Sequence, residues 1–236
     1  MVPYATVVGL GGRSVLDRGR AAVFPLVDEI VANKRHKMIV AVSGGARMRH
    51  VYQIALDLGI PTGGLAMLAG GSEEQYAVML QALLARHGGA AMPRDHFGDL
   101  PLWLQSGIIP IVISMPPYHY WEPPSARGRL PHNGSDLGVY MTAEALGVKA
   151  MIFVKDRDGL YTDDPETNPQ AELIPRIGAR CLLARELPSL IIDRAVVETL
   201  RNARFIKRVQ IINGLRPGNL TRALEGEPVG TIIEKD

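Results

Sequence analysis

The chain has 236 residues, of which 47% are hydrophobic and 21% are charged. This length is within reach of one α/β domain spanning residues 1–236 with a sizeable core, and the aromatic content of only 6% argues against a β-sandwich built on aromatic packing. The formal net charge of +2 provides no strongly basic surface. We therefore expect no nucleic-acid partner and predict small acidic ligands.

Cysteine usage and the start of the chain bear on the compartment. The single cysteine, Cys181, excludes an intrachain disulfide and a cysteine-rich metal site, and is typical of a reducing compartment. The first residues lack the basic segment and cleavage site of a leader, and no run of about 18 apolar residues occurs. We expect a cytoplasmic protein without a membrane partner.

Apolar runs alternate with amphipathic helical patterns along the chain. Short buried strands are predicted at residues 5–10, 37–42, 108–114, 149–154, 208–213 and 230–235. Helices are predicted where apolar residues follow the i, i+3, i+4, i+7 spacing: Val23, Leu26, Val27 and Ile30; Val51, Ile54, Ala55 and Leu58; Tyr76, Met79, Leu80 and Leu83. The alternation predicts an α/β fold with a mainly parallel sheet covered on both faces, whose ligands bind beyond the carboxyl ends of the strands.

A glycine cluster follows the first predicted strand, in the segment VVGLGGRSVLDRG. Gly9, Gly11 and Gly12 precede Arg13 and Ser14, so the G-x-G-x-x-G fingerprint of dinucleotide sites is absent, as is the G-K-[ST] of a Walker loop. The cluster is either a nest of backbone N–H donors for another kind of anion or a tight turn without a ligand.

A second glycine turn follows the second predicted strand, in AVSGGARMRH. Gly44 and Gly45 come directly before Arg47, Arg49 and His50, at the start of the next predicted helix. Two such loops at one edge of a sheet favour a polyphosphate or two anionic ligands. The alternative is that the two arginines are a solvated helix start.

Residues 73–75 and residues 115–135 are two further stretches with candidate functional residues or unusual composition. Glu73 and Glu74 are expected near a helix start, where carboxylates usually partner the helix dipole, and Gln75 is a candidate to line a pocket. Residues 115–135 contain several prolines that forbid a regular helix or a central strand. A loop of this length in a compact domain is usually functional or disordered.

The segment KAMIFVKDRDGLYTDDP ends a predicted strand in a group of polar and aromatic residues. They are Lys155, Asp158, Gly159, Tyr161, Asp163 and Asp164. A lysine neutralises phosphate, an aromatic ring stacks on a base, and a carboxylate accepts a ribose hydroxyl. These residue types together indicate a nucleotide.

The same segment resembles the nucleotide-binding signature of the amino acid kinase superfamily, especially its uridylate kinase branch. The other motifs follow in the family's order: the glycine loop, VSGGA, HNGSDLGVYMTAEALGVKAMIFV and the closing VQIINGLRPGNLTRALEGEPVGTII. Within the superfamily, longer segments are similar to the molybdenum storage proteins: DRG at 17–19, ARMRH at 46–50, MPPYHYWEPP at 115–124 and INGLRPGNLTRALEGEPVGTII at 212–233.

The resemblance implies a three-layer αβα sandwich and a hexamer of like subunits, homomeric or heteromeric, that binds ATP with Mg²⁺ and sequesters molybdate or tungstate as polynuclear oxide clusters. By motif, the implied nucleotide-binding residues are Gly11, Gly12, Gly44, Gly45, Lys155, Asp158, Gly159, Tyr161, Asp164 and Asn213, with Gly214 nearby. Asp136 is implied at the phosphates, where it would organise Mg²⁺ or the catalytic lysine. The glycines would supply backbone donors to the phosphoryl region.

The first glycine loop departs from the family pattern. Kinases of this superfamily usually carry a lysine where this chain has Gly9. Without that charge, a stabiliser of the transition state is missing, which argues against kinase activity and leaves ATP hydrolysis open. Arg13 is a candidate substitute for the lysine, by hypothesis.

The proline-rich stretch supplies candidate metal contacts for the storage function. His119, Glu122 and His132 offer nitrogen and carboxylate groups to a metal-oxide cluster. The alternative is an ordinary subunit contact in which Tyr118, Tyr120 and Trp121 are the packing anchors.

Three functions therefore remain in competition. The first is an ATP-binding store for molybdate or tungstate. The second is a small-molecule kinase of the uridylate kinase type, which transfers the ATP γ-phosphoryl group to a nucleoside monophosphate. The third is an inactive nucleotide-sensing subunit that needs a partner chain. The missing loop lysine and the PPYHYWEPP stretch favour the first.

Overall fold

The computed structural model describes residues 1–117, 134–187 and 189–236. In this part of the chain one sheet has the strand order β3-β4-β2-β1-β5-β9-β10-β8. The bounds are β1 (Thr6–Leu10), β2 (Met38–Val42), β3 (Gly89–Ala91), β4 (Ile109–Ile113), β5 (Ala150–Lys155), β8 (Arg176–Gly178), β9 (Arg208–Asn213) and β10 (Thr231–Glu234). Neighbouring strands are parallel except β9 and β10, which confirms a mainly parallel sheet.

All six strands predicted from apolar runs are present, as β1, β2, β4, β5, β9 and β10. The two strands at the edges of the sheet, β3 and β8, were not predicted. Each has three residues, which is too short for an apolar run or an alternation to stand out. A separate antiparallel pair, β6 (Leu160–Tyr161) and β7 (Leu173–Ile174), was also not predicted.

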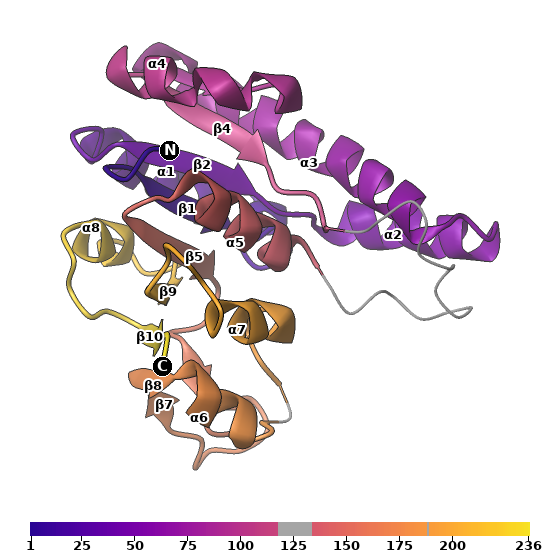
Figure 1. Cartoon of the computed structure of the whole chain (residues 1–236), viewed down its shortest axis with the longest axis vertical. Helices are drawn as coiled ribbons and strands as arrows, with labels where there is room; N and C mark the ends of the chain where they lie inside the picture. Colours follow the sequence, from indigo (N-terminus) through magenta and orange to yellow (C-terminus); the bar gives the residue numbers. More distant parts are fainter. Residues whose placement is uncertain (118–133, 188) are drawn as a thin grey trace.

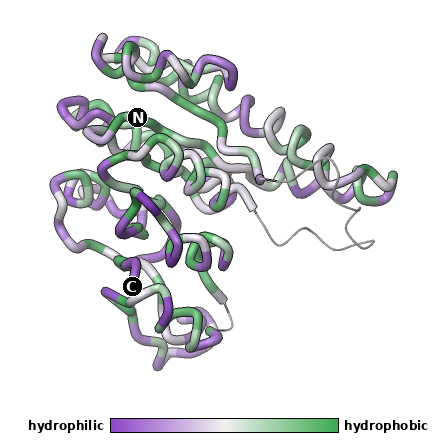
Figure 2. Tube along the Cα trace, in the orientation of Figure 1, coloured by the Kyte–Doolittle hydropathy of each residue, from purple (hydrophilic) through white to green (hydrophobic). Residues whose placement is uncertain are grey.

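Consecutive side chains of the central strands enter two different cores. On β1, Val7 packs into one core and Val8 into the other, and Phe153 and Val154 divide in the same way on β5. The strands are apolar on both faces because each face is covered. Figure 2 shows the central strands as largely hydrophobic segments.

Helices cover both faces and complete three layers (Figure 1). One core includes residues of α4 (Leu100–Gln105), α5 (Ser135–Leu146), α6 (Ala179–Ala184) and α7 (Arg194–Leu200). The other includes residues of α1 (Arg20–Ala32), α3 (Thr62–Leu84) and α8 (Asn219–Leu224). Short 3-10 helices occur at Leu16–Arg18, Ala85–His87 and Arg94–Asp99. The arrangement confirms the three-layer αβα sandwich that the resemblance implies.

The helix α2 (Ala46–Asp57) packs on α3 through a small core of its own. In Figure 1 the two helices lie together at one end of the molecule. The buried face predicted for α2 was partly wrong. Ile54 and Leu58 are 51% and 72% exposed, whereas Tyr52 and Leu56 are buried. On α3, Met79 and Leu83 are likewise exposed, while Tyr76 and Leu80 are buried as predicted. The face predicted on α1 is buried throughout.

The parallel strands β1, β2, β4 and β5 end at the same edge of the sheet. The two glycine turns, the exit from β4 and the segment after Lys155 therefore lie near one another. The helix α5 approaches the same edge with its first residue, and ends before Gly147, whose φ of 58° is favoured by glycine. Within the described ranges, no helix combines the length and the apolarity that a membrane crossing requires.

Candidate functional site

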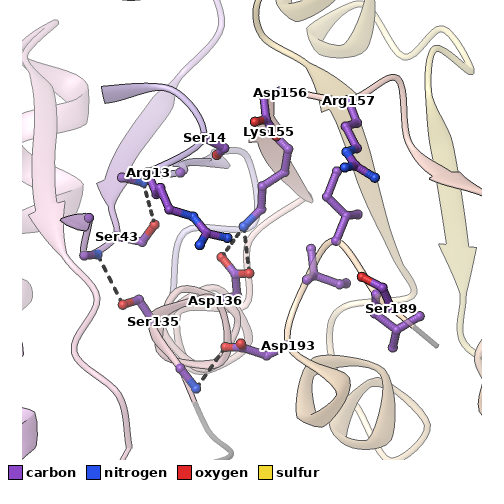
Figure 3. Close-up of a pocket in the computed structure, with 18 of the residues that line it drawn as sticks. Arg13, Ser14, Ser43, Ser135, Asp136, Lys155, Asp156, Arg157, Ser189 and Asp193 are labelled. Carbon is purple, nitrogen blue, oxygen red and sulfur yellow. Dashed lines mark hydrogen bonds and ion pairs between the residues drawn. The ribbon is translucent and has the colours of Figure 1, made fainter. Parts of the chain in front are cut away.

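A pocket with a volume of about 480 Å³ opens at this edge of the sheet (Figure 3). Its wall is formed by both glycine turns, the first part of α2, the start of α5, residues 155–157, 159–161 and 163–165, and residues 189–193. This volume is in the range of small-molecule sites. The pocket therefore collects most of the segments that the sequence motifs indicated.

The two glycine turns are in direct contact. The Gly12 N–H donates to Ser43 Oγ at 3.2 Å, and the Ser43 hydroxyl donates to the Leu10 carbonyl at 3.1 Å. A Cβ at Gly12 would lie only 2.3 Å from the Gly44 carbonyl oxygen, so only glycine permits this approach. The Gly11 N–H donates to the Val154 carbonyl. The turns form one wall of the pocket.

A buried ion pair lies at the centre of the pocket. Lys155 Nζ donates to both carboxylate oxygens of Asp136 at 2.8 and 2.7 Å, and the two side chains are only 10% and 13% exposed. Asp193 accepts from the Gly134 and Leu137 N–H groups at 3.0 and 3.1 Å, at the start of α5. Burial, followed by the charge of Asp136, raises the pKa of Asp193 to about 6.

Arg13 also lines this part of the pocket. Figure 3 shows its side chain extending from the first glycine loop toward Lys155 and Asp136. The structure thus brings both candidate catalytic residues, Asp136 and Arg13, to one pocket.

Residues after β5 form the opposite wall. Arg157 pairs with Asp164 at 2.8 Å and with Glu166 at 2.9 Å. The backbone N–H of Glu166, followed by Arg157, holds the pKa of Asp164 below its usual range. Gly159 and Tyr161 also line the pocket, and Tyr161 is held in the β6–β7 pair.

Asp158 and Asn213 lie behind this wall instead of in it. Asn213 Nδ2 donates to Asp158 Oδ1 at 2.9 Å, and Arg216 pairs with Asp158 at 2.6 Å. Asn213 Oδ1 accepts from the Leu215 N–H. These bonds fasten the end of β9 to the loop after β5. Gly214, which follows β9, is not among the residues of the pocket wall.

The two arginines after the second glycine turn, Arg47 and Arg49, have different surroundings. Arg49 lines the pocket. Arg47 donates to Gln75 Oε1 at 2.7 Å and lies 5.3 Å above the ring of Tyr76, outside the wall. Gln75 is therefore a partner of α2 and does not line the pocket.

Glu73 is a residue whose place the sequence analysis predicted wrongly. The helix begins at Thr62, so Glu73 lies in the middle of α3 and has no exposed surface. It shares a helix face with Ala69, Tyr76 and Leu80, which are all buried. That spacing is the signal that could have identified it as an inward-facing carboxyl.

Three other polar residues at the site were given no role by the sequence analysis, although Asp17 belongs to the DRG motif at 17–19. Asp17 accepts from the Ala46 N–H at 2.7 Å and from the Tyr76 hydroxyl, and so ties the first turn to α2 and α3. Ser43 and Asp193 each accept a hydrogen bond from a backbone N–H far away in the chain, that of Gly12 and that of Gly134. Local sequence carries no signal for such contacts.

The candidate metal contacts His119, Glu122 and His132 lie outside the described residues, as do Tyr118, Tyr120 and Trp121. Among the residues that are described, no three histidine, cysteine, aspartate or glutamate side chains are grouped so as to hold a metal ion.

Comparison with known proteins identifies the family. Residues 5–213 match the model of the amino acid kinase family. The chain belongs to the amino acid kinase family. It is 47% identical over 234 residues to the molybdenum storage protein subunit beta of Azotobacter vinelandii, covering 99% of this chain and 87% of that protein.

Kinases of the family are more distant in sequence. The uridylate kinase of Thermofilum pendens is 27% identical over 213 residues, covering 87% of this chain and 84% of that protein. The solved structure of uridylate kinase from Archaeoglobus fulgidus superimposes with a TM-score of 0.75 at 20% identity, covering 97% of this chain and 99% of that one. This likeness confirms the amino acid kinase fold.

The position at which kinases of the family usually carry the loop lysine is buried in this chain. Gly9 lies within β1, and a Cβ there would be 3.0 Å from Val139 of α5 and 3.2 Å from Met151. A side chain at this position would enter the core between β1 and α5.

Proposed function

We propose that this chain is an ATP-binding subunit of a store that sequesters molybdate or tungstate as polynuclear oxide clusters. The observation that carries the proposal is the 47% identity to a molybdenum storage protein subunit over 99% of the chain. The proposal includes a cytoplasmic hexamer of like subunits, homomeric or heteromeric, in which residues 1–236 form one domain.

The pocket supports the nucleotide part of the proposal. Arg13, Arg49 and Lys155 line one pocket. Their positive charges would attract the negatively charged phosphates of a nucleotide. Tyr161 offers an aromatic ring for a base. Mg²⁺ is usually held by one or two carboxylates together with substrate phosphates, and Asp136 and Asp193 are carboxylates of the same wall. Bound Mg²⁺ would neutralise phosphate charge.

The other predicted nucleotide residues support the site in different ways. The two glycine turns would lie against the phosphates; their residues are Gly11, Gly12, Gly44 and Gly45. The carboxylate of Asp164 would lie beside the base. Asp158 and Asn213 would act indirectly, because they brace the loop after β5. For the stored oxoanions, the proposed contacts are His119, Glu122 and His132.

A kinase of the uridylate kinase type is the second candidate. The shared fold and the Lys155–Asp136 pair in the pocket favour it. The glycine at position 9 opposes it, because no cation from this position reaches the transferring phosphoryl group. Arg13 would have to supply that charge.

The test is elemental analysis of the purified protein after incubation with molybdate, with and without MgATP, alongside measurement of phosphate release. We expect many molybdenum atoms per chain, in an amount that increases with MgATP. Sulfate-incubated protein is the control for adsorbed anions. Absence of bound molybdenum under every condition, together with phosphoryl transfer to a nucleoside monophosphate, would establish the kinase instead.

A further inference from the structure

One carboxyl group joins three segments around the pocket. Glu73 Oε1 accepts from the Gly44 N–H at 3.1 Å, and Oε2 accepts from the Ser114 and Met115 N–H groups, both at 2.9 Å. The same Gly44 N–H lies within hydrogen-bonding distance of Ser135 Oγ, at the start of α5. The second glycine turn and the exit from β4 therefore meet at a single side chain of α3, with the start of α5 beside them.

Two of these residues belong to the pocket wall. Gly44 and Ser135 both line the pocket, and the Gly44 N–H lies 3.2 Å from Ser135 Oγ as well as being bonded to Glu73. Glu73 itself lies behind the wall, on α3. Its carboxyl thus holds the Gly44 N–H behind the wall, and it adds negative charge directly behind the Gly44 turn.

The groups that face Glu73 are hydroxyls and backbone N–H groups. No charged side chain of the surrounding elements is paired with Glu73: Asp136 of α5 pairs with Lys155, Arg47 of α2 bonds to Gln75, and Asp17 bonds to Tyr76 one turn along α3. Arg49 of α2 lines the pocket on the other side of the wall. Arg94, in the 3-10 helix before β4, contacts the sulfur of Met115 and pairs with Glu74. Among the described residues, no counter-ion therefore compensates the Glu73 charge.

Burial raises the pKa of Glu73 to about 7, against the opposing effect of its hydrogen bonds. Near neutral pH the group is consequently divided between its charged and neutral forms. A second negative charge, bound on the pocket side of the Gly44 turn, stabilises the neutral form, because like charges repel across the thin wall.

We propose that Glu73 is a positioning residue whose carboxyl orients the Gly44 turn and takes up a proton from solvent when an anion binds in the pocket. This inference rests on the proposed function and adds the proton linkage of the same site. The proton goes to the carboxylate of Glu73, which keeps an acceptor oxygen for the backbone N–H groups. No covalent bond of the ligand changes.

Isothermal titration calorimetry of the full chain tests the linkage. MgATP and, separately, sulfate are titrated at pH 6, 7 and 8 in buffers that differ in ionisation enthalpy. Sulfate is chosen as the second anion because it neither titrates nor condenses in this range, whereas molybdate takes up protons when it forms polynuclear oxides. We expect uptake of up to about 0.5 proton per anion at pH 7 and an affinity that falls up to about tenfold per pH unit above 7. Glu73→Gln abolishes the uptake, whereas Glu74→Gln, at the exposed neighbouring position, retains it.

The outcomes separate the inference from the proposed function. Binding of MgATP without proton uptake overturns the inference and leaves the function intact. Uptake with sulfate but no binding of MgATP supports the inference and removes the nucleotide from the function. Absence of binding by both probes overturns both. If Glu73→Gln does not fold, the wild-type profile decides, because uptake centred near pH 6 would assign the proton to Asp193 instead.

Discussion

At the scale of single residues, the pocket combines charges that oppose one another. Asp136 is neutralised by Lys155, while Asp193 stands next to Asp136 without a cation of its own at hydrogen-bonding distance among the described residues. Its carboxyl is held by two N–H groups at the start of α5, where the helix dipole also favours a negative charge. Burial outweighs the two hydrogen bonds and the helix dipole, and the pKa of Asp193 is raised.

A raised carboxyl pKa makes stability depend on pH in a defined direction. Between about pH 4 and pH 6 the folded chain keeps the Asp193 proton that the unfolded chain has lost, so the free energy of unfolding falls as pH rises through this window. Asp193→Asn retains an acceptor for both N–H groups and removes the titration. Urea denaturation from pH 4 to 7 should show wild type losing up to about 3 kcal/mol relative to the variant. Parallel curves for the two proteins would contradict this cause.

At the scale of elements, short helices depend on partners elsewhere in the chain. The helix α8 has six residues, too few to be stable alone. Glu29 of α1 accepts from the Gly218 and Thr221 N–H groups at 2.7 and 2.9 Å, and so caps α8 from another helix. A capping residue of this kind does not appear in the local sequence of α8.

Removal of this cap should loosen one element. Glu29→Ala leaves the first N–H groups of α8 without their acceptor and is expected to lower the free energy of unfolding by about 1–2 kcal/mol. Hydrogen exchange should rise in residues 214–226 more than in the central strands. Asp28→Ala, at the exposed neighbouring position, is the matched control. Equal effects of the two substitutions would show that the cap carries no energy.

The elements also show what could be predicted from the sequence. Buried strands were found because both faces are apolar, whereas β3 and β8 are edge strands of three residues. The start of α3 was missed because glycine pairs at 63–64 and 70–71 look like breaks, although packing on β3, β4 and α2 keeps the helix continuous. Most of the motif residues line one pocket, whereas Asp158 and Asn213 lie behind its wall. Glu73 and Asp193 contact the site through hydrogen bonds that join distant segments.

At the scale of the whole molecule, apolar surface remains on the two helices at one end. Ile54 and Leu58 of α2 are exposed, as are Val78 and Met79 of α3. Ile54 and Leu58 lie one helical turn apart, and apolar side chains exposed next to each other are found at protein interfaces. The proposed hexamer would cover it with a second copy of the chain.

Light scattering after size-exclusion chromatography checks this assignment. Replacing Ile54 and Leu58 together by aspartate should reduce the assembly to smaller species without lowering the stability of the core, because neither side chain is buried. Leu102→Asp on α4, also highly exposed, should leave the mass unchanged. An unchanged mass for the α2 variant would exclude this face as the contact.

The contact between Gly9 and α5 has a consequence for how the family could have diversified. A Cβ at position 9 approaches Val139 to 3.0 Å, so a lysine introduced there meets a neighbour fitted to its absence. The two positions are therefore coupled: a lysine at position 9 requires the side chain of Val139 to move, and a smaller residue at 139 would relieve the contact. A change from the proposed storage function to a kinase would on this basis involve α5 as well as the first glycine loop.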